Sequence, residues 1–106
     1  MEMETNNAQT SRISLMEQHL DNATTAVKGL EAALDRYEEV QGAIAALDEY
    51  YGSDQWRQDL DDDEAGRLPE GLKRGVLSQD GIWNLLDDCR ALNTRLLHFA
   101  QDHCRQ

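Results

Sequence analysis

The sequence predicts an all-α fold, in which a long N-terminal helix packs antiparallel on a C-terminal helix and a short middle helix and an ordered loop join the two. Apolar residues recur at alternating intervals of three and four from Ile13 to Tyr51, and a similar stripe runs from Ile82 to His103. The 106 residues include a single proline. Only an α-helix gathers residues at this spacing on one face. We therefore predict a helical hairpin or small bundle whose core is formed by the apolar faces of its helices.

The first stripe spans about forty residues, which as one straight helix would be about 60 Å long. Its members are Ile13, Met16, Leu20, Ala23, Val27, Leu30, Leu34, Tyr37, Val40, Ile44, Leu47 and Tyr51. The alternation slips at Tyr37, where two intervals of three follow each other, and Gly42 lies close to this slip. Because such an offset disturbs helix pairing, we expect a bend or break near residues 38–42.

The ends of this helix can also be predicted. Residues 1–10 are polar and show no periodicity, so we expect a disordered N-terminal tail there. The hydroxyl of Ser11 can cap the first free amides, and Gly52 can end the helix after Tyr51. Residues 11–106 are then expected to form a single helical domain, because a chain of this length has room for one core.

A short middle helix and an ordered loop are expected next. Ser53 or Asp54 can cap a helix that runs to about Glu64, and Gly66 ends it. Residues 67–77 mix turn formers with single apolar side chains. This mixture predicts a loop that its apolar side chains hold against the helices.

The last helix is expected to begin at Ser78, as its cap, and to run to about His103. Gln79 and Asp80 would occupy its first turn. At about 25 residues, or about 37 Å, this helix cannot cover a straight first helix alone. Either the first helix folds back near residues 38–42 into a three- or four-helix bundle, or its uncovered stripe pairs as a coiled coil with a second copy of the chain, in a homodimer.

The formal net charge of −11 is concentrated in the first part of the chain. Residues 1–66 carry sixteen acidic and four basic side chains, whereas residues 67–106 carry five acidic and six basic ones. The densest acidic stretch is Asp48–Glu64, which ends in a candidate acidic face. This face consists of Asp59, Asp61, Asp62, Asp63 and Glu64. Because nucleic acids and anionic membranes are bound through Lys and Arg, the charge argues against direct binding to either.

The protein is expected to be cytoplasmic. No stretch approaches the roughly twenty apolar residues of a membrane span, and no basic and apolar leader marks secretion. Cys89 and Cys104 lie on one predicted helix about 22 Å apart, too far for a disulfide bond. Two free thiols are consistent with a reducing compartment.

Metal-binding patterns are weak. His98, His103 and Cys104 lack a convincing fourth ligand for zinc. A calcium-loop spacing begins at Asp59, but Glu64 stands where such a loop requires glycine. We therefore predict no metal site and no cofactor.

Paired carboxylates leave one enzymatic alternative open. Asp35 and Glu38, and likewise Asp61 and Glu64, have the spacing with which all-helical nucleotide pyrophosphohydrolases hold magnesium. Such pairs are expected by chance among twenty-one acidic residues, and no glycine-rich phosphate loop accompanies them. A magnesium-dependent nucleotide hydrolase is therefore the least favoured reading, and we predict a protein that is not an enzyme.

Two tryptophans and two adjacent bases form a candidate interaction surface. It consists of Trp56, Lys73, Arg74 and Trp83. Aromatic and basic side chains on a loop held by a rigid scaffold are typical of interface hot spots. The structural alternative, which stays open, is that Lys73 and Arg74 only neutralise the acidic stretch before them.

The middle of the chain holds a distinctive set of short motifs. They are Tyr50-Tyr51-Gly52-Ser53, Trp56, Asp63-Glu64-Ala65-Gly66, Leu68-Pro69, Leu72-Lys73-Arg74-Gly75-Val76-Leu77-Ser78 and Asp80-Gly81-Ile82-Trp83. Together with the long helix before them, these motifs resemble the bacterial domain-of-unknown-function family DUF4298 over roughly residues 12–100. The resemblance implies a small bacterial protein and brings no activity or catalytic residues with it.

Two functions follow as predictions. The first is a non-catalytic protein–protein interaction module that presents its uncovered stripe or its middle loop to a protein partner, including a second copy of itself. The second is an acidic inhibitor or decoy, in which Asp48–Glu64 imitates a phosphate backbone and occupies a nucleic-acid-binding protein. The salt dependence of partner binding distinguishes the two predictions, because binding through charge weakens steeply with ionic strength, whereas apolar packing does not.

Overall fold

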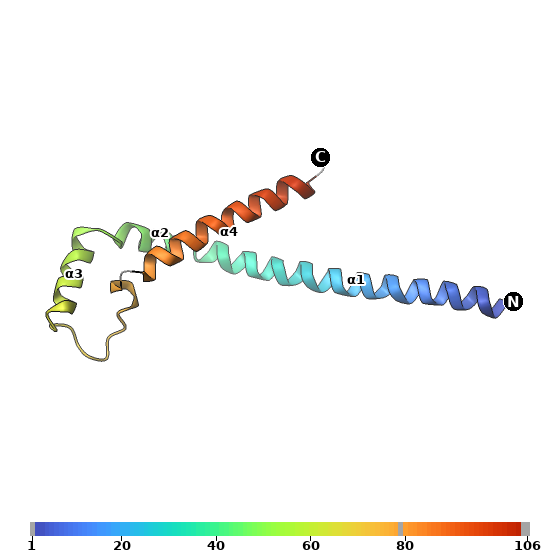
Figure 1. The fold of residues 1–106 in the computed structure, drawn as a ribbon, viewed down its shortest axis with the longest axis horizontal. Coiled ribbons are helices and arrows are strands. Elements are labelled where there is room, and N and C mark those ends of the chain that lie inside the picture. Colours follow the sequence, from blue (N-terminus) through green and yellow to red (C-terminus); the bar gives the residue numbers. More distant parts are fainter. Residues whose placement is uncertain (1, 79, 105–106) are drawn as a thin grey trace. The chain divides into compact units, whose positions relative to one another are not determined.

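The structure is a computed structural model that describes residues 2–78 and 80–104, with side chains from residue 7 onward. Within these residues every regular element is a helix (Figure 1), so the predicted all-α fold is confirmed. The elements are α1 (Glu2–Glu39), α2 (Gln41–Tyr50), α3 (Asp54–Glu64), the 3₁₀ helix η1 (Gly75–Leu77) and α4 (Gly81–His103). They divide into two compact units, Met1–Val40 and Gln41–Gln106.

The first unit consists of α1, a helix of 38 residues. It begins at Glu2, so the predicted start at Ser11 lies inside the helix. Helix propensities explain the difference, because each polar residue costs at most about 0.7 kcal/mol once a helix has formed. Polar composition alone therefore does not end a helix.

The predicted interruption near residues 38–42 is confirmed at Val40. Helix α1 ends at Glu39 and α2 begins at Gln41, with Val40 as a single turn residue between them. The Val40 amide still donates to the carbonyl of Arg36 at 3.2 Å. The interruption falls where the spacing of apolar residues slips, as expected from the offset.

The junction between α2 and α3 follows the capping rules. Gly52 adopts a positive φ of 80°, which glycine reaches without steric strain, and this ends α2. The Ser53 hydroxyl then accepts a hydrogen bond from the amide of Trp56 at 3.1 Å, as an N-cap does. At the other end of α3, Gly66 has a φ of 71° and turns the chain into the loop. The predicted boundaries of this helix are confirmed.

The core of the second unit lies around the start of α4. Its buried side chains are Leu77, Ile82 and Leu86. Helix η1 contacts both α3 and α4, and α2 packs on α4, which runs in the opposite direction (Figure 1). The small loop helix η1 therefore connects α3 to α4 at this cluster of apolar side chains, and α2 joins the unit through its packing on α4.

The start of α4 differs slightly from the prediction. The helix begins at Gly81, because residues 75–77 form a 3₁₀ turn that precedes it. Ser78 still acts near this end, since its hydroxyl accepts from the amide of Gly81 at 3.0 Å and donates to the carbonyl of Gly75 at 2.7 Å. Gln79, which was expected in the first turn, lies outside the described residues.

Candidate interaction surfaces

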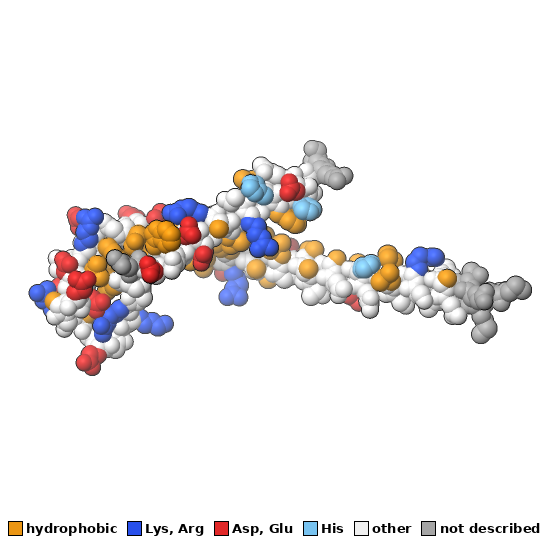
Figure 2. Space-filling model, viewed as in Figure 1, with side chains coloured by type: hydrophobic (Ala, Val, Ile, Leu, Met, Phe, Trp, Pro, Cys, Tyr) orange, Lys and Arg blue, Asp and Glu red, His pale blue; other side chains and the backbone are white. Residues whose placement is uncertain are grey.

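The most extensive apolar surface lies on α1. Helix α1 carries an exposed stripe, here called the α1 seam, whose members are Ile13, Met16, Leu20, Ala23, Val27, Leu30, Leu34 and Tyr37. The large side chains from Ile13 to Leu30 are 51–64% exposed, whereas Leu34 and Tyr37 are half-buried. Hydrophobic side chains recur along the visible face of this helix (Figure 2). Contiguous exposed apolar surface of this kind is typical of interaction sites.

The composition of α1 makes burial of its apolar stripe important for the stability of the helix. Several of its residues are weak helix formers, namely Thr10, Ser11, Ser14, Asn22, Thr24, Thr25 and Gly29. Helices in proteins owe most of their stability to packing of an amphipathic face, and propensity contributes little. Covering the α1 seam would therefore stabilise the helix itself, by about 1.5–3 kcal/mol for each large side chain fully buried.

Trp56, from the predicted interaction surface, is held within the second unit. Its indole Nε1–H donates to the carbonyl of Val76 at 2.9 Å, which links α3 to η1. Tyr51 meets its ring edge-on, with the ring centroids 5.1 Å apart. The side chain is half-buried, so it contributes to the packing of α3 as well as to the surface.

Arg74 closes the loop on α3. Its guanidinium donates to Oδ1 of Asp63 at 3.1 Å and to the carbonyls of Pro69 and Glu70 at 3.3 and 3.1 Å. The planar fork of an arginine suits this combination of a carboxylate and two carbonyls. The geometry favours the structural alternative for Arg74.

Lys73 and Trp83 lie at the surface of the second unit. Trp83 is 50% exposed on α4, and Lys73 is exposed in the loop. Lys73 also lines an open, mainly apolar groove of about 400 Å³, together with Leu47, Val76 and Leu85. The structure thus gives Trp56 and Arg74 internal partners and leaves Lys73 and Trp83 available for contact.

Within the predicted acidic face, Asp59 faces into the unit. Its Oδ2 accepts a hydrogen bond of 2.6 Å from the hydroxyl of Tyr50. This hydrogen bond raises the pKa of Tyr50 to about 12, with smaller contributions from burial and from the negative charge of Asp59. Asp59 is thereby a link between α2 and α3.

Two further carboxylates of the acidic face pair with loop arginines. Asp62 accepts from Arg67 at 2.8 Å, and Asp63 accepts from Arg74 at 3.1 Å. Asp61 and Glu64 are exposed. The candidate acidic face is therefore partly neutralised by arginines of its own loop, as the structural alternative for Arg74 expected.

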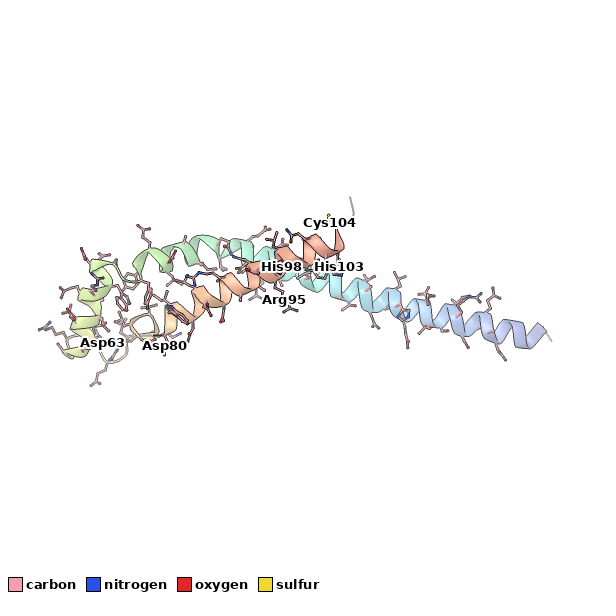
Figure 3. The ribbon with its side chains drawn as sticks, turned by 45° about the horizontal axis from the view of Figure 1, so that its top comes forward. Asp63, Asp80, Arg95, His98, His103 and Cys104 are labelled. Carbon is pink, nitrogen blue, oxygen red and sulfur yellow. The ribbon has the colours of Figure 1, made fainter. Side chains whose placement is uncertain are left out.

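The residues considered as metal ligands do not converge. His98 and His103 lie in the last turns of α4, and Cys104 follows the end of the helix (Figure 3). The Nδ1–H of His103 donates to the carbonyl of Phe99 at 3.0 Å. Asp59 and its acidic neighbours belong to helix α3 and not to a calcium-binding loop. Among the residues that the structure describes, no group of three or more potential ligands could hold a metal ion.

Two features of the structure were not predicted from the sequence. The hydrogen bond between Tyr50 and Asp59 joins residues nine positions apart on different helices, which helical periodicity cannot reveal. The apolar groove forms only when the loop folds against α2 and α4. The apolar residues of the loop, among them Leu72 and Val76, which are exposed in the structure, were the available signal.

Comparisons with known proteins give one family. No helix among the described residues has the length and apolar character needed to cross a membrane. Neither the curated proteins nor the solved structures contain a match to this chain. The family described as Domain of unknown function (DUF4298) matches residues 13–99, which include the α1 seam, the acidic face and the loop. Since this match spans most of the 106 residues, the chain belongs to the DUF4298 family.

Proposed function

We propose that the protein is a non-catalytic interaction module that binds a protein partner through the α1 seam. The observation that carries the proposal is the exposure of the seam, whose large side chains from Ile13 to Leu30 are more than half exposed. Helix-in-groove and helix–helix recognition use apolar anchors at this spacing. The cytoplasm is the proposed compartment, which the free thiols of Cys89 and Cys104 support.

The second unit has a separate role in this proposal. Its hydrogen bonds, from Trp56 to Val76 and from Arg74 to Asp63, hold a small folded body at the end of the chain. Lys73, which lines the apolar groove, and the exposed Trp83 on α4 supply smaller contact surfaces there. The α1 seam remains the main site, since its apolar stripe is much longer.

A matched pair of variants tests the proposal. Val27→Asp places a charge in the α1 seam, whereas Thr25→Asp places the same charge on the outer side of the same helix. The wild-type protein and both variants would be immobilised and exposed to a bacterial lysate in about 200 mM salt, where surface charge pairs are largely screened. Proteins retained by wild type and by Thr25→Asp, but lost with Val27→Asp, are expected. Equal retention by all three proteins would contradict the proposal.

The acidic decoy is the alternative, and the exposed carboxylates of Asp61 and Glu64 are what favours it. The ion pairs of Asp62 and Asp63 with loop arginines argue against the decoy, because they reduce the negative charge that a nucleic-acid-binding protein could contact. A decoy would bind a nucleic-acid-binding protein at about 50 mM salt and lose it by about 200 mM. The combined variant Asp61→Asn, Glu64→Gln would abolish that binding and leave binding through the α1 seam unchanged.

A further inference from the structure

The spacing of the α1 seam places its residues in successive heptads. The first apolar position of each heptad is held by Ile13, Leu20, Val27 and Leu34, and the second by Met16, Ala23, Leu30 and Tyr37. Three to four heptads with both positions apolar are the usual signature of a coiled coil. The seam is long enough for such pairing and is uninterrupted up to the break at Val40.

The two flanks of the α1 seam differ in charge. The flank that follows each second apolar position holds Glu17, Thr24, Glu31 and Glu38. The flank that precedes each first apolar position holds Arg12, His19, Ala26 and Ala33. One flank is thus acidic, and the other carries a base and no acid. This asymmetry decides which pairings bring like charges together.

A parallel pairing of two identical helices satisfies these charges. In such a pair, each residue on the flank that precedes the first apolar position lies beside a residue of the other copy's acidic flank, five positions later in the sequence. Arg12 then lies beside Glu17 of the second copy, and twofold symmetry repeats this pair. The next positions on the acidic flank meet His19, Ala26 and Ala33, and none of these carries a negative charge.

An antiparallel pairing of two copies places the acidic flanks against each other. Glu17 would then lie near Glu31 or Glu38 of the second copy, and the like charges would repel. Arg12 would no longer lie beside Glu17 of the second copy. The charges along α1 therefore select a second copy in the same direction and in register.

We propose that the partner of the α1 seam is a second copy of this chain, paired as a parallel, in-register coiled coil over residues 12–38. This inference rests on the proposed function, because it names the partner of the same surface. Pairing would cover the seam side chains that are more than half exposed in the single chain.

The mass of the 106-residue chain in solution tests this inference. Sedimentation equilibrium should give twice the 12.0 kDa of one chain, with reducing agent present to exclude disulfide-linked copies. Val27→Asp should raise the dimer dissociation constant at least tenfold, and Thr25→Asp should leave it within about twofold. A dimer unaffected by Val27→Asp would overturn the inference. A monomeric wild-type protein would also overturn it, yet the proposed function would stand if lysate binding still depended on Val27.

Charge reversal tests the direction of pairing. Glu17→Arg should weaken the parallel dimer about tenfold, because it brings two positive charges together at both symmetry-related sites. The double variant Arg12→Glu, Glu17→Arg should restore most of the affinity, since it exchanges the partners. In an antiparallel dimer, Glu17→Arg would instead face Glu31 or Glu38 and strengthen association. A gain in affinity from the single variant would therefore overturn the parallel arrangement.

Discussion

Tyr50 and Asp59 join α2 to α3 through a hydrogen bond of 2.6 Å, in which the phenol hydroxyl donates to the carboxylate. The two residues lie on either side of the turn at Gly52. Loss of the phenolic proton would place two negative charges at this distance. The bond therefore couples the ionisation of Tyr50 to the packing of the two helices.

Alkaline titration should reveal this coupling. The pKa of Tyr50 is raised to about 12, above the ordinary value of about 10, so the folded protein holds the proton more tightly than the unfolded chain. The resulting stabilisation is complete below about pH 10 and is lost as the pH rises through about 12. Absorbance at the tyrosinate band should contain a component near pH 12. This component should be absent from Tyr50→Phe and should move to lower pH in Asp59→Asn.

Trp56→Phe should lower the free energy of unfolding of the second unit by about 1 kcal/mol, because it removes the hydrogen bond to Val76 and keeps an aromatic ring. Trp83→Phe is the matched control, since the Trp83 side chain is half exposed. Its effect should stay within about 0.5 kcal/mol. Urea unfolding followed by circular dichroism measures both variants. Equal losses would mean that the Trp56 hydrogen bond contributes nothing measurable.

Arg74→Gln should destabilise the loop by about 1–2 kcal/mol, because it removes the ion pair with Asp63 and weakens the bonds to two loop carbonyls. Lys73→Gln removes the same charge from the adjacent residue and should have little effect. Hydrogen exchange of the amides in residues 67–77 provides the measurement. Faster exchange in both variants to the same extent would indicate a general effect of charge and no specific role for Arg74.

Two glycines should respond to alanine in opposite ways. A Cβ at Gly81 would collide with the carbonyl oxygen of Gly75 and would lie 2.8 Å from the hydroxyl of Ser78. Gly81→Ala should therefore destabilise the second unit by about 1–3 kcal/mol. A Cβ at Gly29 meets nothing within 4 Å, so Gly29→Ala should stabilise α1 by up to about 1 kcal/mol. Thermal unfolding of both variants checks the pair, and a stabilising Gly81→Ala would contradict the close approach.

Helical periodicity predicted those parts of the fold that depend on neighbouring residues. The break at Val40 follows from the slip in apolar spacing, and the cap at Ser53 follows from its hydroxyl before a helical pattern. Both are local effects, and the sequence displays local effects directly. The helical start at Glu2 was missed because polar composition was taken as a sign of disorder.

Contacts between residues far apart in the sequence cannot be predicted from helical periodicity. The Trp56 indole bonds to Val76, twenty positions later, and Arg74 reaches back to Asp63. Which partner each side chain finds depends on the path of the loop, and that path is fixed by tertiary contacts. For this reason the sequence identified Trp56 and Arg74 as candidates but could not distinguish their structural role from recognition.

The interruption at Val40 also bears on cooperativity. It separates a helix with an exposed apolar face from a unit that has its own buried cluster around Ile82. Such units open with different free energies, so a single melting temperature would not describe the chain. A dimer through the α1 seam would make the melting of residues 2–39 depend on protein concentration, whereas the melting of the second unit would not. Two transitions with different concentration dependence would be the thermodynamic signature of this one turn residue.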